Sequence, residues 1–233
     1  MSSLHPADKW SCEKDIYFNC EDQELDIELL VESISTTQDL SYAPTQKRTT
    51  RSSQFETSNI SEEIAKCVES IQLVFELHVY TKITSDVLKM MRLCVKKNLN
   101  KMDIAKDVEI EDETTELLVD LLKQKQFHQM FLRGKCSAAL QEIIASWREN
   151  SEEMVGKMIS CKEGFAEFQL SPTEFPFEEC TEEEERDAKR AYPFAGHWPK
   201  ITAKSVLKTQ DGRGAVYCLS RRDPQFKTLF VFA

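Results

Sequence analysis

Apolar residues recur at alternating steps of four and three over a long middle stretch of this chain, residues 60–168. The spacing is followed first by Ile60, Ile64, Cys67, Ile71, Val74 and His78. It then runs unbroken through Leu140, Ile144, Trp147, Ser151, Met154, Met158, Cys161, Phe165 and Phe168. Such spacing places side chains on one face of an α-helix, and a sustained seam is typical of coiled-coil packing. The pattern predicts that this region packs helix against helix.

Four helices are expected from the periodicity and its start and stop signals. The first spans about 61–81, and the second begins at Thr84 or Ser85 and carries Leu88, Met91, Val95, Leu99 and Met102 inward. The third begins at Thr114 or Thr115 and continues to Phe131, before a C-terminal glycine at position 134. The fourth is one long helix over about 137–168; the alternative is a break at Asn150, with Ser151 capping a new helix. The expected fold is therefore mainly α, with a bundle of about four helices over 59–170.

The chain after this bundle changes in character. Residues 171–199 are expected to form a loop and a short charged helix, because Thr181 and Glu184 have the spacing of a capping box. Apolar runs on both sides of residues 210–214 indicate a hairpin, and 226–232 is a third strand candidate. We expect residues 200–233 to be a small antiparallel β-meander packed on the bundle.

Residues 1–58 are expected to be a largely disordered, acidic and Ser/Thr-rich tail. The stretch from Thr36 to Ser58 is too poor in aliphatic residues to offset its ordering entropy. An amphipathic segment at 15–34 mixes acidic with apolar residues, which suits a segment that folds against a partner. Its partner-binding candidates are Ile16, Tyr17, Phe18, Leu25, Ile27, Leu29, Leu30 and Ile34. Thr50 and Ser52, in a basic stretch, are phosphorylation candidates, with an inert linker as the alternative.

Charge and cysteine usage narrow the function classes. The net charge of −10 makes a chain-wide nucleic-acid surface or docking on an anionic membrane unlikely. No apolar run approaches the roughly 18 residues that a membrane-spanning helix needs. The eight cysteines are widely spaced and no export signal opens the chain, so we expect a reducing compartment, the cytoplasm or the nucleus.

A search for catalytic, cofactor and metal motifs finds nothing specific. The closest glycine pair, Gly212 and Gly214, belongs to the predicted hairpin rather than to a phosphate-binding loop. Neither a Glu-x-x-His motif nor the ligand spacing of a zinc site is present. We therefore predict no cofactor, no metal and no catalytic residues. A catalytic thiol remains an alternative: Cys136 just before a helix start, or Cys161, with His128 or His197 as base.

The function expected from these observations is that of a non-enzymatic interaction subunit or adaptor. It would bind another protein through the bundle and the acidic amphipathic segment. One alternative is a nucleic-acid-associated factor that uses local basic faces at 89–106 and 186–213; a cysteine-dependent enzyme is the other. No internal repeat is recognisable in the sequence.

Overall fold

The structure is a computed structural model. It describes residues 13–21, 24–33, 47–55, 74, 76–80, 82–105, 110–168, 170–191, 201–222 and 225–233, and for the first three ranges it describes the backbone alone. None of the helices in these ranges has the length and apolar character to cross a membrane.

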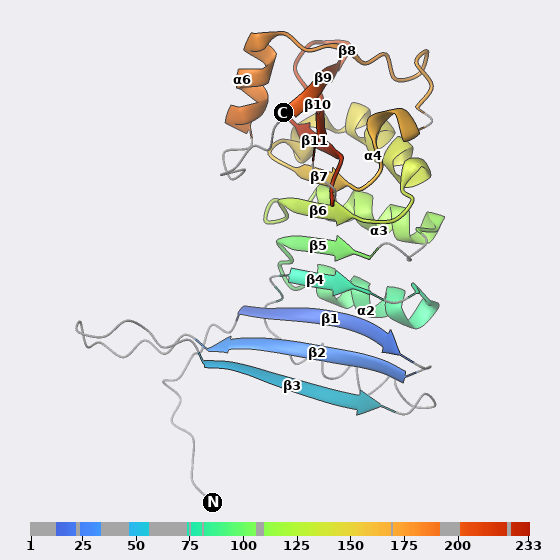
Figure 1. The fold of residues 1–233 in the computed structure, drawn as a ribbon, viewed down its shortest axis with the longest axis vertical. Helices are drawn as coiled ribbons and strands as arrows, with labels where there is room; N and C mark the ends of the chain where they lie inside the picture. The colour runs from blue at the N-terminus through green and yellow to red at the C-terminus, as the bar shows by residue number, and fades with distance from the viewer. Residues whose placement is uncertain are drawn as a thin grey trace, which may run out of the picture.

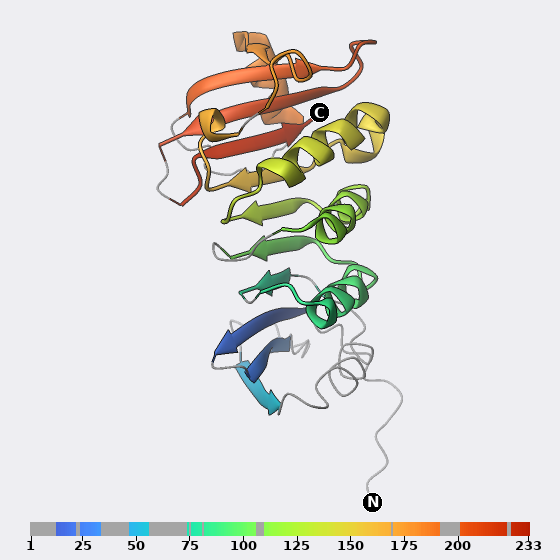
Figure 2. The same ribbon diagram turned by 90° about the vertical axis from the view of Figure 1, so that its right-hand side faces the viewer.

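One mixed β-sheet runs the length of the molecule, with its strands in the order β3-β2-β1-β4-β5-β6-β7-β11-β10-β9-β8 (Figure 1). The prediction of a mainly α fold built on a helical bundle is therefore wrong. The helices do not pack around one another in a bundle; they lie side by side against the sheet (Figure 2). The chain has an α/β fold.

A strand–helix unit repeats through the centre of the sheet. Its elements are β4 (Glu76–Val79), α2 (Ser85–Val95), β5 (Lys101–Ile104), α3 (Asp112–Leu122), β6 (Gln129–Leu132), α4 (Ser137–Glu149) and β7 (Met158–Cys161). The four strands are parallel and pair in chain order, and their first residues, Glu76, Lys101, Gln129 and Met158, are 25, 28 and 29 residues apart. Periods of 20–50 residues with each unit packed on the next are typical of solenoid proteins.

Each central strand supplies two buried apolar side chains to the core between sheet and helices. Leu77, Met102, Met130 and Ile159 pair along one row, and Val79, Ile104, Leu132 and Cys161 along the next. All eight side chains are buried. Because side chains alternate across a strand, burial of these two rows turns the intervening residues to the opposite face.

The helices in the structure are shorter than the predicted ones, and strands replace the ends of the predicted helices. Residues 76–79 of the predicted first helix form β4, while 61–73 lie outside the described residues. The cap of the second is confirmed, since Val87 N donates to Thr84 Oγ1 at 3.3 Å, but α2 ends at Val95 and Met102 belongs to β5. Likewise α3 ends at Leu122, and Phe131 belongs to β6.

The predicted single helix over 137–168 is also wrong. Helix α4 ends at Glu149, a four-residue helix α5 (Ser151–Met154) follows, and the chain then enters β7. The alternative break at Asn150 is correct, although no long helix follows it. Gly156 between α5 and β7 has φ 77°, a conformation that favours glycine and redirects the chain. Pairing with β6 on one side and β11 on the other fixes β7 as a strand.

The C-terminal part extends the sheet. It comprises the short 3-10 helix η1 (Phe165–Glu167), β8 (Glu178–Glu179), α6 (Glu182–Ala191), β9 (Ile201–Lys208), β10 (Ala215–Arg221) and β11 (Thr228–Phe232). The predicted capping box opens α6: Thr181 N donates to Glu184 Oε2 at 2.8 Å, and Glu184 N donates to Thr181 Oγ1 at 3.3 Å.

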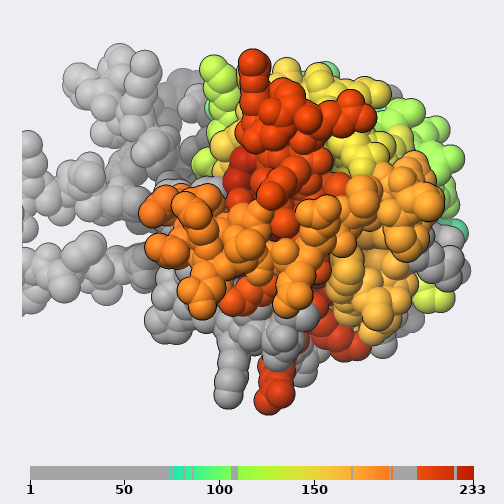
Figure 3. Space-filling model, turned by 90° about the horizontal axis from the view of Figure 1, so that it is seen from above, coloured from blue at the N-terminus to red at the C-terminus, as the bar shows by residue number. Residues whose placement is uncertain are grey.

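Strands β9, β10 and β11 form the antiparallel meander expected in 200–233. The meander joins the edge of the central sheet, because β11 pairs with β7, and Phe232 of β11 packs against Trp147 of α4. Helix α6 covers the face opposite α2–α4 there, packing Ala188 near Tyr217 and Leu219. Figure 3 shows β9, β10 and the chain from about 170 to 191 closing this end of the molecule.

At the other end, the backbone forms β1 (Glu13–Glu21), β2 (Glu24–Ser33) and β3 (Lys47–Phe55). Strand β1 pairs in parallel with β4, and β2 and β3 continue antiparallel. These strands contrast with the largely disordered tail predicted for 1–58. The side chains of these strands and the remainder of 1–73 lie outside the described residues, so the predicted boundary near residue 58 is not tested.

Candidate functional site

The face of the central sheet opposite α2–α4 carries charged and aromatic side chains. Every second residue of β4–β7 is apolar and faces the helices, so the residues between them face the other way. They form two rows across the strands: Glu76, Lys101, Gln129 and Met158 in one, and His78, Asp103, Phe131 and Ser160 in the other. No described helix covers this face over β4–β6 (Figures 1 and 2). We call this surface, together with Tyr80 and Arg133 just beyond the strands, the helix-free face.

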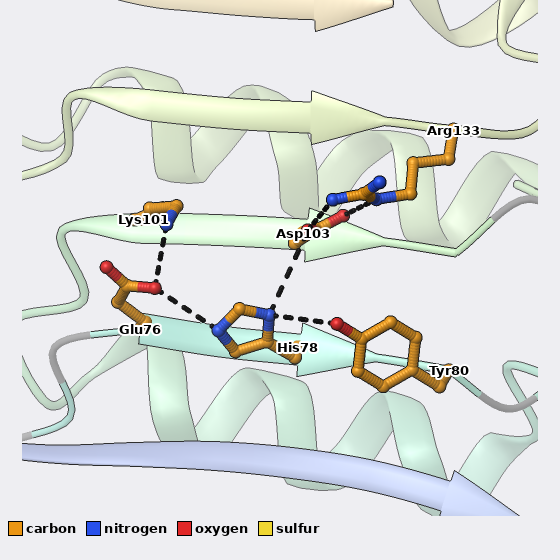
Figure 4. Close-up of polar contacts among 6 residues, drawn as sticks. All are labelled: Glu76, His78, Tyr80, Lys101, Asp103 and Arg133. Atoms are coloured by element: carbon orange, nitrogen blue, oxygen red, sulfur yellow. Dashed lines mark hydrogen bonds and ion pairs between the residues drawn. The ribbon is translucent and has the colours of Figure 1, made fainter. Parts of the chain in front are cut away.

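A chain of polar contacts crosses β4 and β5 on this face (Figure 4). Lys101 Nζ lies 2.8 Å from Glu76 Oε2, and the same oxygen lies 3.2 Å from His78 Nε2. On its other side, His78 Nδ1 is 3.4 Å from the Tyr80 hydroxyl and 3.9 Å from Asp103 Oδ2. The imidazole is thus held between two carboxylates, and its side chain is only 10% exposed.

The chain of contacts ends in a two-armed ion pair between β5 and the residue after β6. Arg133 Nε and Nη2 donate to Asp103 Oδ1 and Oδ2 at 2.7 and 2.6 Å. The guanidinium also stacks on the Phe226 ring, 4.9 Å from its centroid. Phe226 packs against Phe131. The Lys101 ammonium lies over the Phe131 ring, 5.3 Å from the ring centroid. Strands and rings together therefore fix these charged groups in place.

The electrostatics of the site follow from these contacts. The hydrogen bond from His78 and the adjacent Lys101 hold the pKa of Glu76 below its ordinary value of 4.5, against the opposing effect of burial. Burial, and then the Asp103 charge, raise the pKa of Tyr80, so this phenol stays protonated at neutral pH. The Asp103 carboxylate raises the pKa of Arg133. Two carboxylates and two cations compensate one another, so the site holds its charges without large net charge.

The thiol that the sequence offers as a nucleophile lies elsewhere, in the core at the start of α4. Cys136 is 2% exposed, and its Sγ lies 3.4 Å from Glu163 Oε2, which also accepts from Cys136 N at 2.9 Å. A hydrogen bond with the Cys161 thiol, and then burial, raise the pKa of Cys136. A helix N-terminus was expected to lower that pKa; the neighbouring thiol and carboxylate and the burial outweigh it. His197 lies outside the described residues.

The partner-binding and phosphorylation candidates are not tested. Seven of the partner-binding residues, Ile16, Tyr17, Phe18, Leu25, Ile27, Leu29 and Leu30, lie on β1 and β2, whose side chains are not described. Ile34 lies outside the described residues. Thr50 and Ser52 lie on β3, which is likewise described by its backbone alone.

The two basic stretches that motivate a nucleic-acid role do not form single faces. In 89–106, Arg92 lies on α2 and pairs with Glu113 of α3, whereas Lys101 points to the helix-free face. In 186–213, the described cations are largely matched by acids: Lys204 pairs with Glu185 and Lys208 with Glu184.

The residues of the helix-free face escaped the sequence search because they come from three short segments about 25 residues apart. His78 also fits the helical spacing that begins at Ile60, which places it on the apolar face of the first predicted helix. A usable signal exists: Glu76-x-His78-x-Tyr80 and Lys101-x-Asp103 alternate with apolar residues, as in a strand with one polar face.

Among the described residues, no group of three His, Cys, Asp or Glu side chains is arranged to hold a metal ion. Comparisons with family models, with curated proteins and with solved structures gave no significant match.

Proposed function

We propose that this protein is a non-enzymatic interaction subunit that binds another protein through the helix-free face of β4–β6. The observation that carries the proposal is the fixed set of aromatic and charged side chains on that face. Tyr80 is 42% exposed there, one of two large apolar side chains that are exposed among the described residues. Tyrosine and arginine are the residue types enriched at the energetic centres of protein interfaces.

The preorganisation of these polar groups supports a role in binding. The ion pair of Arg133 with Asp103, and the contacts of His78 with Glu76, hold polar groups in one arrangement before a partner arrives. Ordering such side chains on binding costs about 0.5–1.5 kcal/mol each when they are free, so fixing them in advance favours association. A rigid parallel sheet backed by helices is the kind of surface that solenoid proteins use for extended contacts.

The two other functions have less support. A catalytic thiol needs a lowered pKa, whereas the pKa of Cys136 is raised and its side chain is buried. A nucleic-acid surface needs cations without acidic partners, and Lys204 and Lys208 have such partners. The five described free cysteines fit the cytoplasm or nucleus, which we retain as the proposed location.

The test is site-specific photo-crosslinking in cells. A photo-reactive phenylalanine analogue replaces Tyr80 in one variant and Glu116, an exposed residue of α3 on the helix side, in the other. We expect a discrete crosslinked protein from position 80 that position 116 does not give. In addition, Tyr80→Ala should reduce recovery of that protein at least tenfold, and Glu116→Ala should leave it unchanged. The same products from both positions, or none from position 80, would contradict the proposal.

A further inference from the structure

Arg133 has N–H donors beyond the two that bind Asp103. A guanidinium has five N–H groups. Asp103 accepts from Nε and Nη2, and no described residue accepts from Nη1. The side chain is 32% exposed, and Figure 4 shows it reaching back from the end of β6 to Asp103 at the carboxyl end of β5. A guanidinium clamped by a carboxylate and a ring, with one edge open, is positioned to donate to a ligand oxygen.

Two lysines lie close to Arg133, one on the next strand and one along the chain. Lys162 directly follows β7, and its backbone N donates to Leu132 O at 3.0 Å, so it lies beside Arg133 on the next strand. Strand alternation turns Lys162 to the same face as Arg133, since both follow residues buried on the helix side. Lys135 is exposed in the loop between Arg133 and α4. Neither lysine has an ion-pair partner within the part of the chain that the structure describes.

Two acids of the described residues near this edge are already engaged. Asp103 is bound by Arg133, and the Glu163 carboxylate accepts from Cys136. Glu113, in the first turn of α3, pairs with Arg92 of α2 on the helix side. Within the described part of the chain, Arg133, Lys135 and Lys162 outnumber Asp103 and Glu163 at the carboxyl ends of these strands, although the net charge of the whole chain is −10.

We propose that the carboxyl-end edge formed by Arg133, Lys135 and Lys162 binds carboxylate side chains of an acidic peptide segment in the partner protein. This inference rests on the proposed function and adds the chemistry of the partner. A carboxylate would accept from the open edge of Arg133, and the flanking ammonium groups would add short-range attraction. The Debye length of about 8 Å at physiological salt lets these three cations act locally while screening most of the distant negative charge.

A nucleic acid fits the same edge less well. Phosphate-backbone binding depends on the neutralisation of many phosphates, and three cations on a strongly acidic chain supply few contacts while the whole chain repels a long polyanion. A short acidic segment needs only one or two such contacts. The neighbouring Tyr80 ring, which is 42% exposed, offers apolar surface to the rest of a peptide.

The experiment uses fluorescence anisotropy with the full chain at about 0.15 M salt, where the distant negative charge of the chain is screened. The probes are a labelled hexaglutamate peptide, a matched hexaglutamine peptide and a labelled single-stranded oligothymidylate. We expect binding of hexaglutamate and no binding of hexaglutamine. The double variant Lys135→Gln/Lys162→Gln should weaken hexaglutamate binding at least tenfold. The control double variant Lys123→Gln/Lys125→Gln, at the opposite ends of the strands, should leave it within twofold.

A second variant tests the guanidinium itself. Arg133→Lys keeps the positive charge but loses the planar set of N–H donors, and we expect it to bind hexaglutamate at least threefold more weakly. Circular dichroism and thermal unfolding verify that the variant is folded. The inference is overturned by equal affinity in the lysine variants and the control, by no binding of hexaglutamate, or by tighter binding of oligothymidylate than of peptide. If any of these occurs while Tyr80 still crosslinks a specific protein, the proposed function stands and only the partner's acidic character is wrong.

Discussion

Arg133 and Asp103 form a two-armed ion pair that joins neighbouring strands on the open side of the sheet. The Asp103 side chain is 5% exposed and the Arg133 side chain 32% exposed, so the carboxylate depends on the arginine for its main compensation. Removing one partner of a buried pair leaves an uncompensated charge, which costs more than the pair itself contributes. The ion pair is therefore the part of the site most sensitive to substitution.

Arg133→Gln should destabilise the protein by about 2 kcal/mol, at the lower end for a buried pair because the arginine is partly exposed. Urea unfolding followed by circular dichroism measures the change. The double variant Arg133→Gln/Asp103→Asn should lose less than the two single variants added together, because it leaves no lone carboxylate. Strict additivity would show that the two side chains do not interact in solution.

Glu76 should make stability depend on pH in the acidic range. Its pKa in the folded protein is lowered from 4.5 by His78 and Lys101, so the folded state binds its proton less readily than the unfolded state. This contribution is complete above pH 4.5 and is lost as the pH falls through the lower folded value. The stability advantage of the wild type over Glu76→Gln should therefore shrink as the pH falls from 6 to 3 in urea unfolding. An advantage constant over that range would contradict the prediction. Glu116→Gln, at an exposed position, serves as the control.

Lys157 should be essential to the fold although no function is assigned to it. This lysine is 2% exposed, and its ammonium donates to the carbonyl oxygens of Gln124, Lys125 and Phe127 at 2.6, 3.3 and 2.6 Å. Lys157→Met would leave these carbonyls without their charged donor, at a cost of about 3 kcal/mol. Chemical denaturation should show this loss, whereas Lys125→Met, at an exposed side chain, should change stability by less than about 0.5 kcal/mol. A stable Lys157→Met variant would mean that the ammonium is dispensable.

Buried thiols should resist alkylation in the folded protein. Burial raises the pKa of Cys94 to about 12, and the pKa values of Cys136 and Cys218 are raised as well. Because the thiolate is the reactive form, iodoacetamide at pH 8 should leave these three residues unmodified while labelling the partly exposed Cys180 faster. Peptide mass spectrometry locates the modified residues. Rapid labelling of Cys136 would instead revive the catalytic-thiol interpretation.

The helix starts illustrate which local features were predictable. The Thr84 cap of α2 and the Thr181–Glu184 capping box of α6 depend on side chains within three residues of one another, so their spacing in the sequence is sufficient evidence. The hairpin between β9 and β10 is equally local, with Gly212 at φ 70° in its loop. Each of these features is specified within one short segment.

The central strands show why the prediction of a helical bundle failed. A four-residue strand such as β6 (Gln129–Leu132) offers only two inward positions, and these also fit a spacing of four and three continued from the adjacent helix. The same ambiguity extended the seam from Trp147 through Cys161, where β7 lies. Short apolar runs do not distinguish helix from strand when the window is longer than the strand.

The sequence by itself determined the local elements: where helices are capped, where the C-terminal hairpin turns and which residues are too apolar to stay exposed. Only the tertiary structure decided that Leu77, Met102, Met130 and Ile159 pair as neighbouring strands, and thereby that His78, Asp103 and Arg133 meet on one face. The physical reason is that a strand is stabilised by main-chain hydrogen bonds to partners about 25 residues away. The four residues of the strand do not by themselves specify those partners.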